Sequence, residues 1–190
     1  MANNKPIAAG KSSFDLIDSE KFLDSLSMSS DSVVLDAACG VGAYSLAMAS
    51  HCPNGKIFSF DLWEAGIDRL CVEVFGGVIT NIVPKVADLC ALPLGSDTID
   101  ICLLATVLHD LMQDDTDQDV LLEIKRVLRA GGVLAVIEFK KIAGKPGPPI
   151  NIRISPAELD ETLRLFGFTP CRKSEIDLGD YNYLALYRLP

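Results

Sequence analysis

The stretch that decides the fold is VLDAACGVG, residues 34–42. A short β-branched and apolar run reaches an acid, Asp36, and a loop containing Gly40 and Gly42 follows. Glycine lets the backbone turn tightly and approach a ligand closely, and a helix that begins near Gly42 offers unpaired N–H groups. In open α/β sheets, ligands bind at such carboxyl ends of strands. A plain tight turn between strand and helix explains an isolated G-x-G equally well.

Outward from this loop, short apolar runs alternate with helical patterns. The pattern predicts strands at 32–37, 56–61, 78–87, 99–105 and 133–139, and helices at 19–26, 42–50, 64–75 and 116–129. Gly131 and Gly132 are expected to end the last of these helices. Strands that alternate with helices predict a parallel sheet covered on both faces.

The C-terminal part follows a different order. Ser155, Pro156 and Glu158 form a helix start, and the helix is expected to end at Gly167. Strands follow at 168–176 and 183–189, with a short turn between them, so they must pair antiparallel. The sequence therefore predicts a single α/β domain over 1–190, with a seven-stranded, mostly parallel sheet, helices on both faces and a C-terminal antiparallel β-hairpin.

Charge and composition exclude several classes of function. Lys and Arg number 17 against 26 Asp and Glu, so the net charge is −9, and no basic run predicts nucleic-acid binding. The apolar stretches are shorter than the roughly 18 residues that a membrane span needs. Residues 1–13 contain no apolar signal core, so a cytoplasmic location is expected. The six cysteines include no C-x-x-C pair and the chain has only two histidines, so we predict free thiols and no metal site.

Two further acids follow the next two predicted strands. Asp61 is placed to accept hydrogen bonds from a ribose diol, although it could instead cap the following helix. Asp88 could accept from the exocyclic amine of adenine, with the Leu89 N–H facing a ring nitrogen, or could cap a turn. Ser45 replaces the third glycine of a dinucleotide motif, and Asp36 favours a ligand with an ammonium group. The three acids together describe a pocket for an amino acid, a ribose and an adenine.

With these features the sequence resembles the class I S-adenosylmethionine-dependent methyltransferases, in the branch of the ubiquinone and menaquinone C-methyltransferases. Four segments carry the resemblance: VVLDAACGVG (33–42), FSFD (58–61), VADLCALPLGSDTIDICLLATVLHDL (86–111) and LLEIKRVLRAGGVLAVIEFKK (121–141). It implies a Rossmann-like fold with S-adenosyl-L-methionine as the cofactor. It further implies an N-terminal arm or lid over 1–18, a cofactor-binding core over 32–141, and a substrate-side loop, helix and hairpin over 142–190.

The resemblance also implies roles for individual residues. Asp36, Ala38, Gly40 and Gly42 would surround the methionine part of the cofactor. Asp61 and Leu62 would hold the ribose, and Asp88 and Leu89 would contact the adenine. Ala105 and Thr106 would lie below the sulfonium. The arm, including Lys11 and Phe14, would fold over the cofactor.

His109 is the one candidate for proton transfer, because it follows the fourth predicted strand and its ordinary pKa of about 6.5 suits a base. A structural histidine bonded to a loop carbonyl is the alternative. The proline-rich stretch 144–153 is expected to face the substrate, where Lys145 and Arg153 could attract an acidic group, or to be a plain crossover.

These features predict a methyltransferase that acts on a small molecule, as a monomer or homodimer. Two other classes stay open. A non-catalytic or regulatory nucleoside-binding protein would keep the same pocket. An NAD(P)-dependent oxidoreductase should show a hydride-transfer pair such as Y-x-x-x-K, and the sequence contains none. Methylation of a thiol or arsenic centre through Cys39 or Cys102 is disfavoured because both are expected to be buried.

Overall fold

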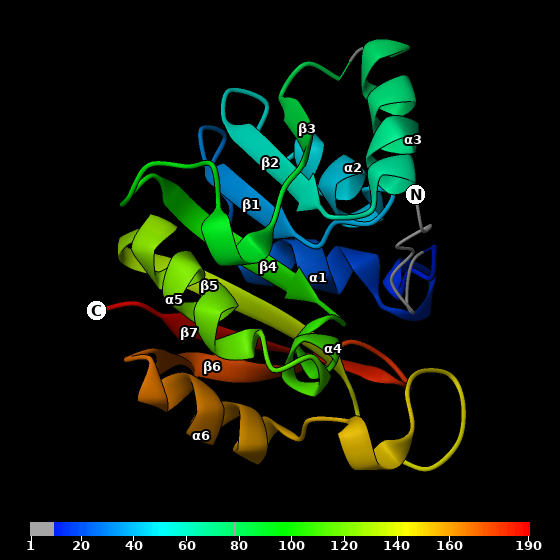
Figure 1. The fold of residues 1–190 in the computed structure, drawn as a ribbon, viewed down its shortest axis with the longest axis vertical. Helices are drawn as coiled ribbons and strands as arrows, with labels where there is room; N and C mark the ends of the chain where they lie inside the picture. The colour runs from blue at the N-terminus through cyan, green and yellow to red at the C-terminus, as the bar shows by residue number, and fades with distance from the viewer. Residues whose placement is uncertain (1–9, 78) are drawn as a thin grey trace.

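A central twisted sheet with helices on both faces forms the core of the molecule (Figure 1). The computed structural model describes residues 10–77 and 79–190, without the side chains of Lys173 and Ser174, so the first half of the expected arm lies outside it. The strands are β1 (Val33–Ala37), β2 (Lys56–Asp61), β3 (Ile82–Val86), β4 (Ile99–Ala105), β5 (Leu128–Phe139), β6 (Thr169–Asp177) and β7 (Asn182–Arg188). The helices are α1 (Ser19–Leu26), α2 (Ala43–Ala49), α3 (Glu64–Phe75), α4 (Leu108–Gln113), α5 (Asp117–Val127) and α6 (Pro156–Leu165).

The sheet has the strand order β3-β2-β1-β4-β5-β7-β6. Its first five strands pair in parallel, and β7 pairs antiparallel with both β5 and β6. The predicted fold class and the antiparallel hairpin are therefore confirmed. The chain order reverses beside β1, where β1 lies between β2 and β4, and this is where ligands of such sheets bind.

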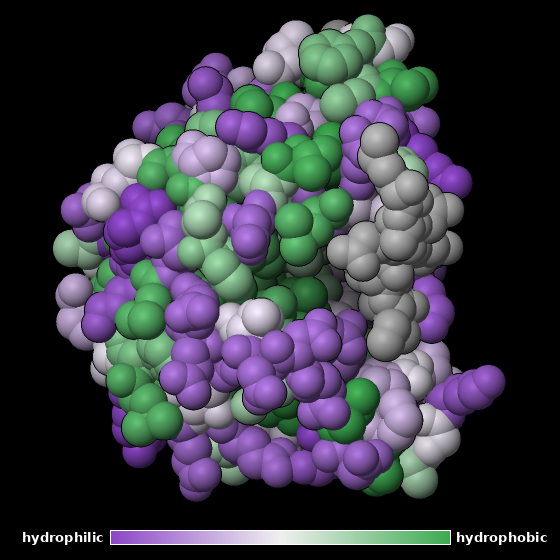
Figure 2. Space-filling view, in the orientation of Figure 1, coloured by the Kyte–Doolittle hydropathy of each residue, from purple (hydrophilic) through white to green (hydrophobic). Residues whose placement is uncertain are grey.

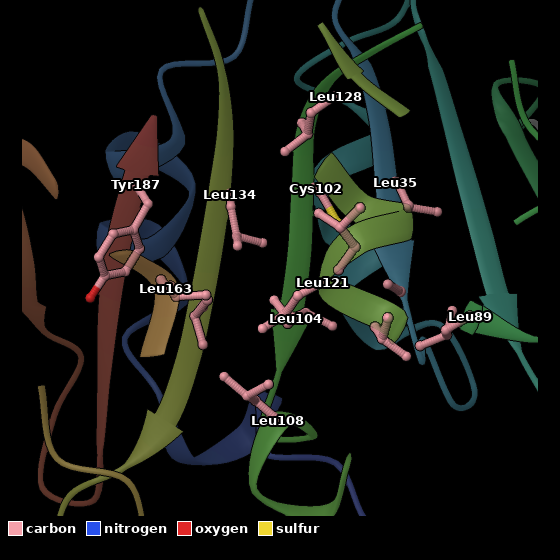
Figure 3. Close-up of a cluster of buried hydrophobic side chains, with 14 of the residues drawn as sticks. Leu35, Leu89, Cys102, Leu104, Leu108, Leu121, Leu128, Leu134, Leu163 and Tyr187 are labelled. Carbon is pink, nitrogen blue, oxygen red and sulfur yellow. The ribbon is translucent and has the colours of Figure 1, made fainter. Parts of the chain in front are cut away.

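Alternate residues of the strands form two separate cores, one on each face of the sheet. Leu35 of β1 packs with α4, α5 and α6 on one face, whereas Val34 packs with α1, α2 and α3 on the other. Figure 3 shows the first core, in which Leu104 and Leu134 of the sheet lie among helix side chains such as Leu121 and Leu163. The predicted coverage of both faces is confirmed.

Hydrophilic side chains cover much of the face turned to the viewer in Figure 2, with hydrophobic side chains mixed among them. Within the described ranges 10–77 and 79–190, no helix is both long and apolar enough to cross a bilayer.

The structure corrects several local predictions. The helix expected over 116–129 ends at Val127, and β5 begins at Leu128 rather than at residue 133. Gly131 therefore belongs to the strand, where its N–H donates to the Leu189 carbonyl (2.8 Å). Leu128 pairs with Ile99 of β4, and Gly131 and Gly132 exchange hydrogen bonds with Leu189, so tertiary contacts override the local signal. Of the strand predicted over 78–87, residue 78 lies outside the described residues, and β3 covers only Ile82–Val86 of the rest. The short helix α4 was not predicted.

A single arginine organises the loop between β5 and α6. Arg153 is 2% exposed, and its five guanidinium N–H groups donate to alternate loop carbonyls, those of Lys140, Ile142, Gly144, Pro146 and Pro148, at 2.6–3.0 Å. This satisfies every donor of the group, which offsets the cost of burying its charge. The expectation that Arg153 attracts an acidic substrate is wrong, because the loop itself occupies all five donors.

We expect Arg153→Met to lower the free energy of unfolding by about 2–4 kcal/mol, because it leaves several loop carbonyls without a charged donor. Urea unfolding measures this change. The matched control is Arg164→Met, since Arg164 is exposed on α6 and should change stability by less than about 0.5 kcal/mol. Equal losses in the two variants would show that the loop does not depend on the Arg153 guanidinium.

Candidate functional site

The candidate site lies at the carboxyl ends of β1, β2 and β4, around the loop between β1 and α2. Three of the loop's residues adopt left-handed backbone angles: Ala38 (φ 62°), Gly40 (φ 59°) and Gly42 (φ 80°). A Cβ at Gly42 would lie 2.5 Å from Leu70 Cδ1, so this position needs glycine for space as well as for its backbone angle. Among the residues that the structure describes, none has an atom within 4 Å of a Cβ placed at Gly40, so these residues leave open space beside the loop.

Asp61 holds this loop against the end of β2. Its carboxylate accepts from the Gly40 N–H at 2.8 Å and from the Trp63 N–H at 2.7 Å, and the Cys39 N–H donates to the Phe60 carbonyl at 3.0 Å. Trp63, not Asp61, is the N-cap of α3. The alternative role of Asp61 as a helix cap is therefore wrong, and its carboxylate lies beside Gly40 at the candidate site.

Gly66 is a residue of this site that the sequence reasoning missed. A Cβ at this position of α3 would lie 2.7 Å from the Gly40 carbonyl oxygen and 2.5 Å from the Trp63 ring. Only glycine lets the helix approach the loop this closely. An isolated glycine inside a helical pattern was the available signal.

Asp36 lies beneath the loop instead of at its surface. It is 1% exposed, and its carboxylate accepts from the Ser45 hydroxyl at 2.5 Å, with Ser59 bonded to Ser45 at 2.6 Å. Burial raises the pKa of Asp36 to about 7, against the lowering effect of the Ser45 hydrogen bond. Ser45, which interrupts the dinucleotide motif, is thus the partner of this acid.

A small cavity of about 50 Å³ lies between the loop and the end of β4. Ala38, Gly40, Ala105 and Thr106 line one part of it, and the arm residues 10–13 line another. Ser13 bonds to Tyr44 (2.7 Å) and to Thr106 (3.1 Å) through its hydroxyl, which fastens the arm across the cavity. The rings of Phe14 and Phe22 each pack edge-on against Tyr44. Ser13 and Tyr44 were not predicted as site residues, since nothing in their local sequence distinguishes them.

The remaining predicted cofactor contacts follow β2 and β3. Leu62 is 61% exposed next to Asp61, whereas Leu89 is buried. Asp88 is exposed, and one oxygen of its carboxylate accepts from the Cys90 N–H at 2.9 Å, so it caps a short 3-10 helix over Leu89–Ala91. The alternative role of Asp88 as a turn cap is confirmed. Its place after the end of β3 still puts an exposed carboxylate near the same edge of the sheet.

His109 lies in the first turn of α4 and is 5% exposed. Its Nδ1 is 2.7 Å from Oε2 of Glu138, a residue with no exposed surface at the end of β5. Burial lowers the pKa of His109, but the hydrogen bond and charge of Glu138 outweigh it, so the pKa is raised. The alternative named a loop carbonyl as the partner of His109, and the structure gives a carboxylate. Sequence reasoning did not assign Glu138 to the site.

Larger surface clefts lie elsewhere in the molecule. One of about 750 Å³ separates the end of α4 from α6 and is lined by side chains including Met112, Lys141 and Glu161. The glycine loop takes no part in it. Among the residues that the structure describes, no group of three or more His, Cys, Asp or Glu side chains could hold a metal ion.

Comparison with known proteins agrees with this geometry. A family model described as a methyltransferase domain matches residues 35–136. This chain belongs to that family. The matched range contains the glycine loop, Asp61, Asp88 and the ends of β3 and β4, which are the parts that form the candidate site.

Two curated relatives are similar in sequence to part of this chain. A ubiquinone/menaquinone biosynthesis C-methyltransferase of Syntrophotalea carbinolica is 32% identical over 57% of this chain and 44% of its own length. A demethylmenaquinone methyltransferase of Lactobacillus johnsonii is 28% identical over 87% of this chain and 64% of its own length. This methyltransferase-domain chain thus spans less than two thirds of either relative.

The fold also matches solved structures. A SAM-dependent methyltransferase from Aquifex aeolicus superposes with a TM-score of 0.84 at 24% identity, covering 98% of this chain and 95% of the other. The N-methyltransferase NodS from Bradyrhizobium japonicum, solved with S-adenosyl-L-homocysteine, has a TM-score of 0.72 at 20% identity and is covered over 94% of its length. At these identities the likeness establishes the fold.

We expect Asp36→Asn to remove a pH dependence of stability. The folded-state pKa of Asp36 is raised from 3.8 to about 7, so its contribution to stability is complete below pH 4 and is lost as pH rises through 7. Between pH 5 and 7 the wild type should lose up to about 1.4 kcal/mol per pH unit relative to the variant. Urea unfolding at pH 5, 6, 7 and 8 measures the difference.

The control for this series is Asp68→Asn, because Asp68 is exposed on α3. Its stability relative to wild type should not change with pH over this range. A difference between wild type and Asp36→Asn that stays constant from pH 5 to pH 8 would contradict the raised pKa.

Proposed function

We propose that this protein binds S-adenosyl-L-methionine at the carboxyl edge of its sheet and transfers the methyl group to a small-molecule acceptor. The observation that carries the proposal is the glycine loop that Asp61 holds in place, since Gly40 borders open space that any side chain would enter. Family membership and the methyltransferase names of the relatives support the same activity.

The residues of the site fit this cofactor. The left-handed loop, Ala38 to Gly42, presents backbone to the methionine part, and the carboxylate of Asp61 with Leu62 would hold the ribose. Asp88 and Leu89 would meet the adenine from the end of β3. Ala105 and Thr106 border the small cavity, where the reactive end of the cofactor would lie.

The cofactor, when bound, supplies a methyl group on a positively charged sulfur, so the protein need not create an electrophile. The chain's own residues would orient the acceptor and exclude water. Correct positioning of two reactants can contribute up to about 7–11 kcal/mol to catalysis.

The arm is proposed to act as a lid. Its residues 10–13 line the 50 Å³ cavity, and pockets for small ligands measure roughly 300–1,000 Å³. The Ser13 bonds to Tyr44 and Thr106 would therefore open to admit the cofactor and form again around it. Lys11 and Phe14 belong to this same segment.

For the acceptor, the relatives' names favour a hydroxylated aromatic ring of the quinol type. We test this class with 1,4-dihydroxynaphthalene beside a primary amine and a small thiol, and follow S-adenosylhomocysteine formation by mass spectrometry. Methylation of the diol supports the proposal, and methylation of the amine or thiol alone would contradict the acceptor class.

The cytoplasmic location, the lack of nucleic-acid binding and a monomeric or homodimeric state stay predictions of the sequence.

The cofactor is tested by calorimetry. We expect S-adenosylmethionine and S-adenosylhomocysteine to bind and NAD not to bind. Binding of NAD alone would favour the oxidoreductase alternative, whereas nucleoside binding without methylation of any acceptor would favour a regulatory protein.

Gly40→Ala should weaken the affinity for S-adenosylhomocysteine at least tenfold, about 1.4 kcal/mol, because the new methyl group would occupy the proposed cofactor space. The matched control is Gly131→Ala. Gly131 has a similar left-handed angle, φ +76°, and equally open surroundings, but it lies near the amino end of β5. Both variants should lose about 1–2 kcal/mol of stability from backbone strain. Equal affinities in the two variants would place the cofactor elsewhere.

A further inference from the structure

The end of β5 carries a buried carboxylate whose bonds converge on one histidine. Glu138 accepts from the His109 ring at Nδ1 (2.7 Å) and from the His109 backbone N–H (3.2 Å). The Phe139 N–H donates to the same carboxylate at 3.4 Å. Because the backbone and ring of His109 are both bonded to one group, the orientation of the imidazole is fixed.

His109 and Glu138 follow the two paired strand ends next to the small cavity: Ala105 of β4, which lines the cavity, pairs with Ile137 of β5. Thr106 lines that cavity, and its N–H donates to the carbonyl of Ile137 at 2.7 Å, one residue before Glu138. α4 begins two residues after Thr106, which brings His109 to the same edge of the sheet. The Phe139 ring contacts the imidazole edge-on, with the ring centres 6.3 Å apart.

The two ring nitrogens of His109 have different surroundings. Nδ1 is bonded to Glu138, whereas Nε2 lies 3.6 Å from Asp110 Oδ1, too far for a hydrogen bond. The charged groups that act on the ring are Glu138 from β5, Asp110 from α4 and Arg153 from the segment before α6. The two acids raise the pKa of His109, and burial and Arg153 lower it.

We propose that Glu138 is a positioning residue for methyl transfer: it holds the proton of neutral His109 on Nδ1, which leaves Nε2 as the atom that takes a proton from the acceptor. This inference rests on the proposed function. A carboxylate cannot donate a hydrogen bond when ionised, so its partner Nδ1 must carry the hydrogen. Nε2 then keeps the free electron pair that a general base requires.

For a hydroxylated aromatic acceptor the step balances as follows. The hydroxyl proton passes to His109 Nε2, and an adjacent ring carbon bonds to the methyl carbon. The bond from methyl to sulfur breaks, and its electron pair stays on sulfur. The ring carbon then releases its own hydrogen to solvent as a proton, the ring becomes aromatic again, and the oxygen recovers its proton from Nε2.

The first test measures the tautomer of His109 by ¹⁵N NMR. The chain has only two histidines, and the exposed His51 serves as an internal reference, with His51→Gln for assignment. We expect neutral His109 to carry its proton on Nδ1. In Glu138→Gln its proton affinity should fall about tenfold, while that of His51 stays unchanged. A proton on Nε2 in the wild-type protein would overturn the proposal.

The second test follows the pH dependence of methyl transfer to 1,4-dihydroxynaphthalene. In the wild-type protein, kcat/KM should rise with pH as His109 loses its proton. In Glu138→Gln the maximum should fall at least tenfold, and the inflection should move to lower pH by about one unit, with KM for the cofactor unchanged. Glu73→Gln, an equal charge change on the exposed side of α3, should leave the profile unaltered.

These outcomes separate a positioning role from a structural one. A Glu138→Gln variant that is only less stable, with the wild-type inflection retained, would overturn the proposal. If the wild type binds S-adenosylmethionine but methylates nothing, both the proposed function and the proton-transfer role fail. The tautomer measurement then still decides whether Glu138 orients the ring. If Glu138→Gln does not fold, the wild-type tautomer and pH profile provide the decision.

Discussion

The candidate site depends on the hydrogen bond between the Asp61 carboxylate and the Gly40 N–H. This 2.8 Å bond joins the ends of two adjacent parallel strands through the loop that follows β1. Gly40 donates this bond from a loop whose backbone is left-handed at Ala38, Gly40 and Gly42. Gly66 of α3 completes the arrangement by letting the helix lie close behind the loop. The ends of β1 and β2, the shape of the loop and the packing of α3 therefore all depend on contacts of Gly40.

Three buried charged or titratable groups lie near this edge of the sheet, and each is hydrogen-bonded. Asp36 is bonded to Ser45, Glu138 to His109, and Arg153 to five loop carbonyls. Burying such groups is costly unless their hydrogen bonds are satisfied, so hydrophobic packing alone would not place them there. These groups lie near the strand ends, where the proposed function places the cofactor.

The cavity at the glycine loop is small because the chain covers it with its own arm. Ser13 bonds to Tyr44 and Thr106 there, and Phe14 packs against Tyr44. These contacts involve few side chains, although Ser13 and Tyr44 are buried and Tyr44 belongs to the core that packs on α1, α2 and α3. A segment held in this way can open at a lower free-energy cost than the sheet beneath it. This gives the proposed lid a physical basis in the contacts of residues 10–14.

The local pattern of the sequence was sufficient for the main architecture. Short β-branched runs and amphipathic helices predicted five parallel strands, both helical layers and the antiparallel hairpin, because burial on one or two faces imposes its period on the residues. The ends of elements were less well determined. Gly131 and Gly132 looked like a helix end, yet β5 begins at Leu128, which pairs with Ile99 of β4, and both glycines bond to Leu189.

The sequence by itself determined the fold class and the residues at the ends of the strands, because a strand ending in an acid before glycines is a local signal. Only the tertiary structure decided which atoms those residues contact. It turned Asp36 inward to Ser45, paired His109 with Glu138 and joined Ser13 to Thr106, across separations of 9, 29 and 93 residues. Such contacts depend on how the sheet brings distant strand ends together, and no periodicity in one segment encodes the partner supplied by another.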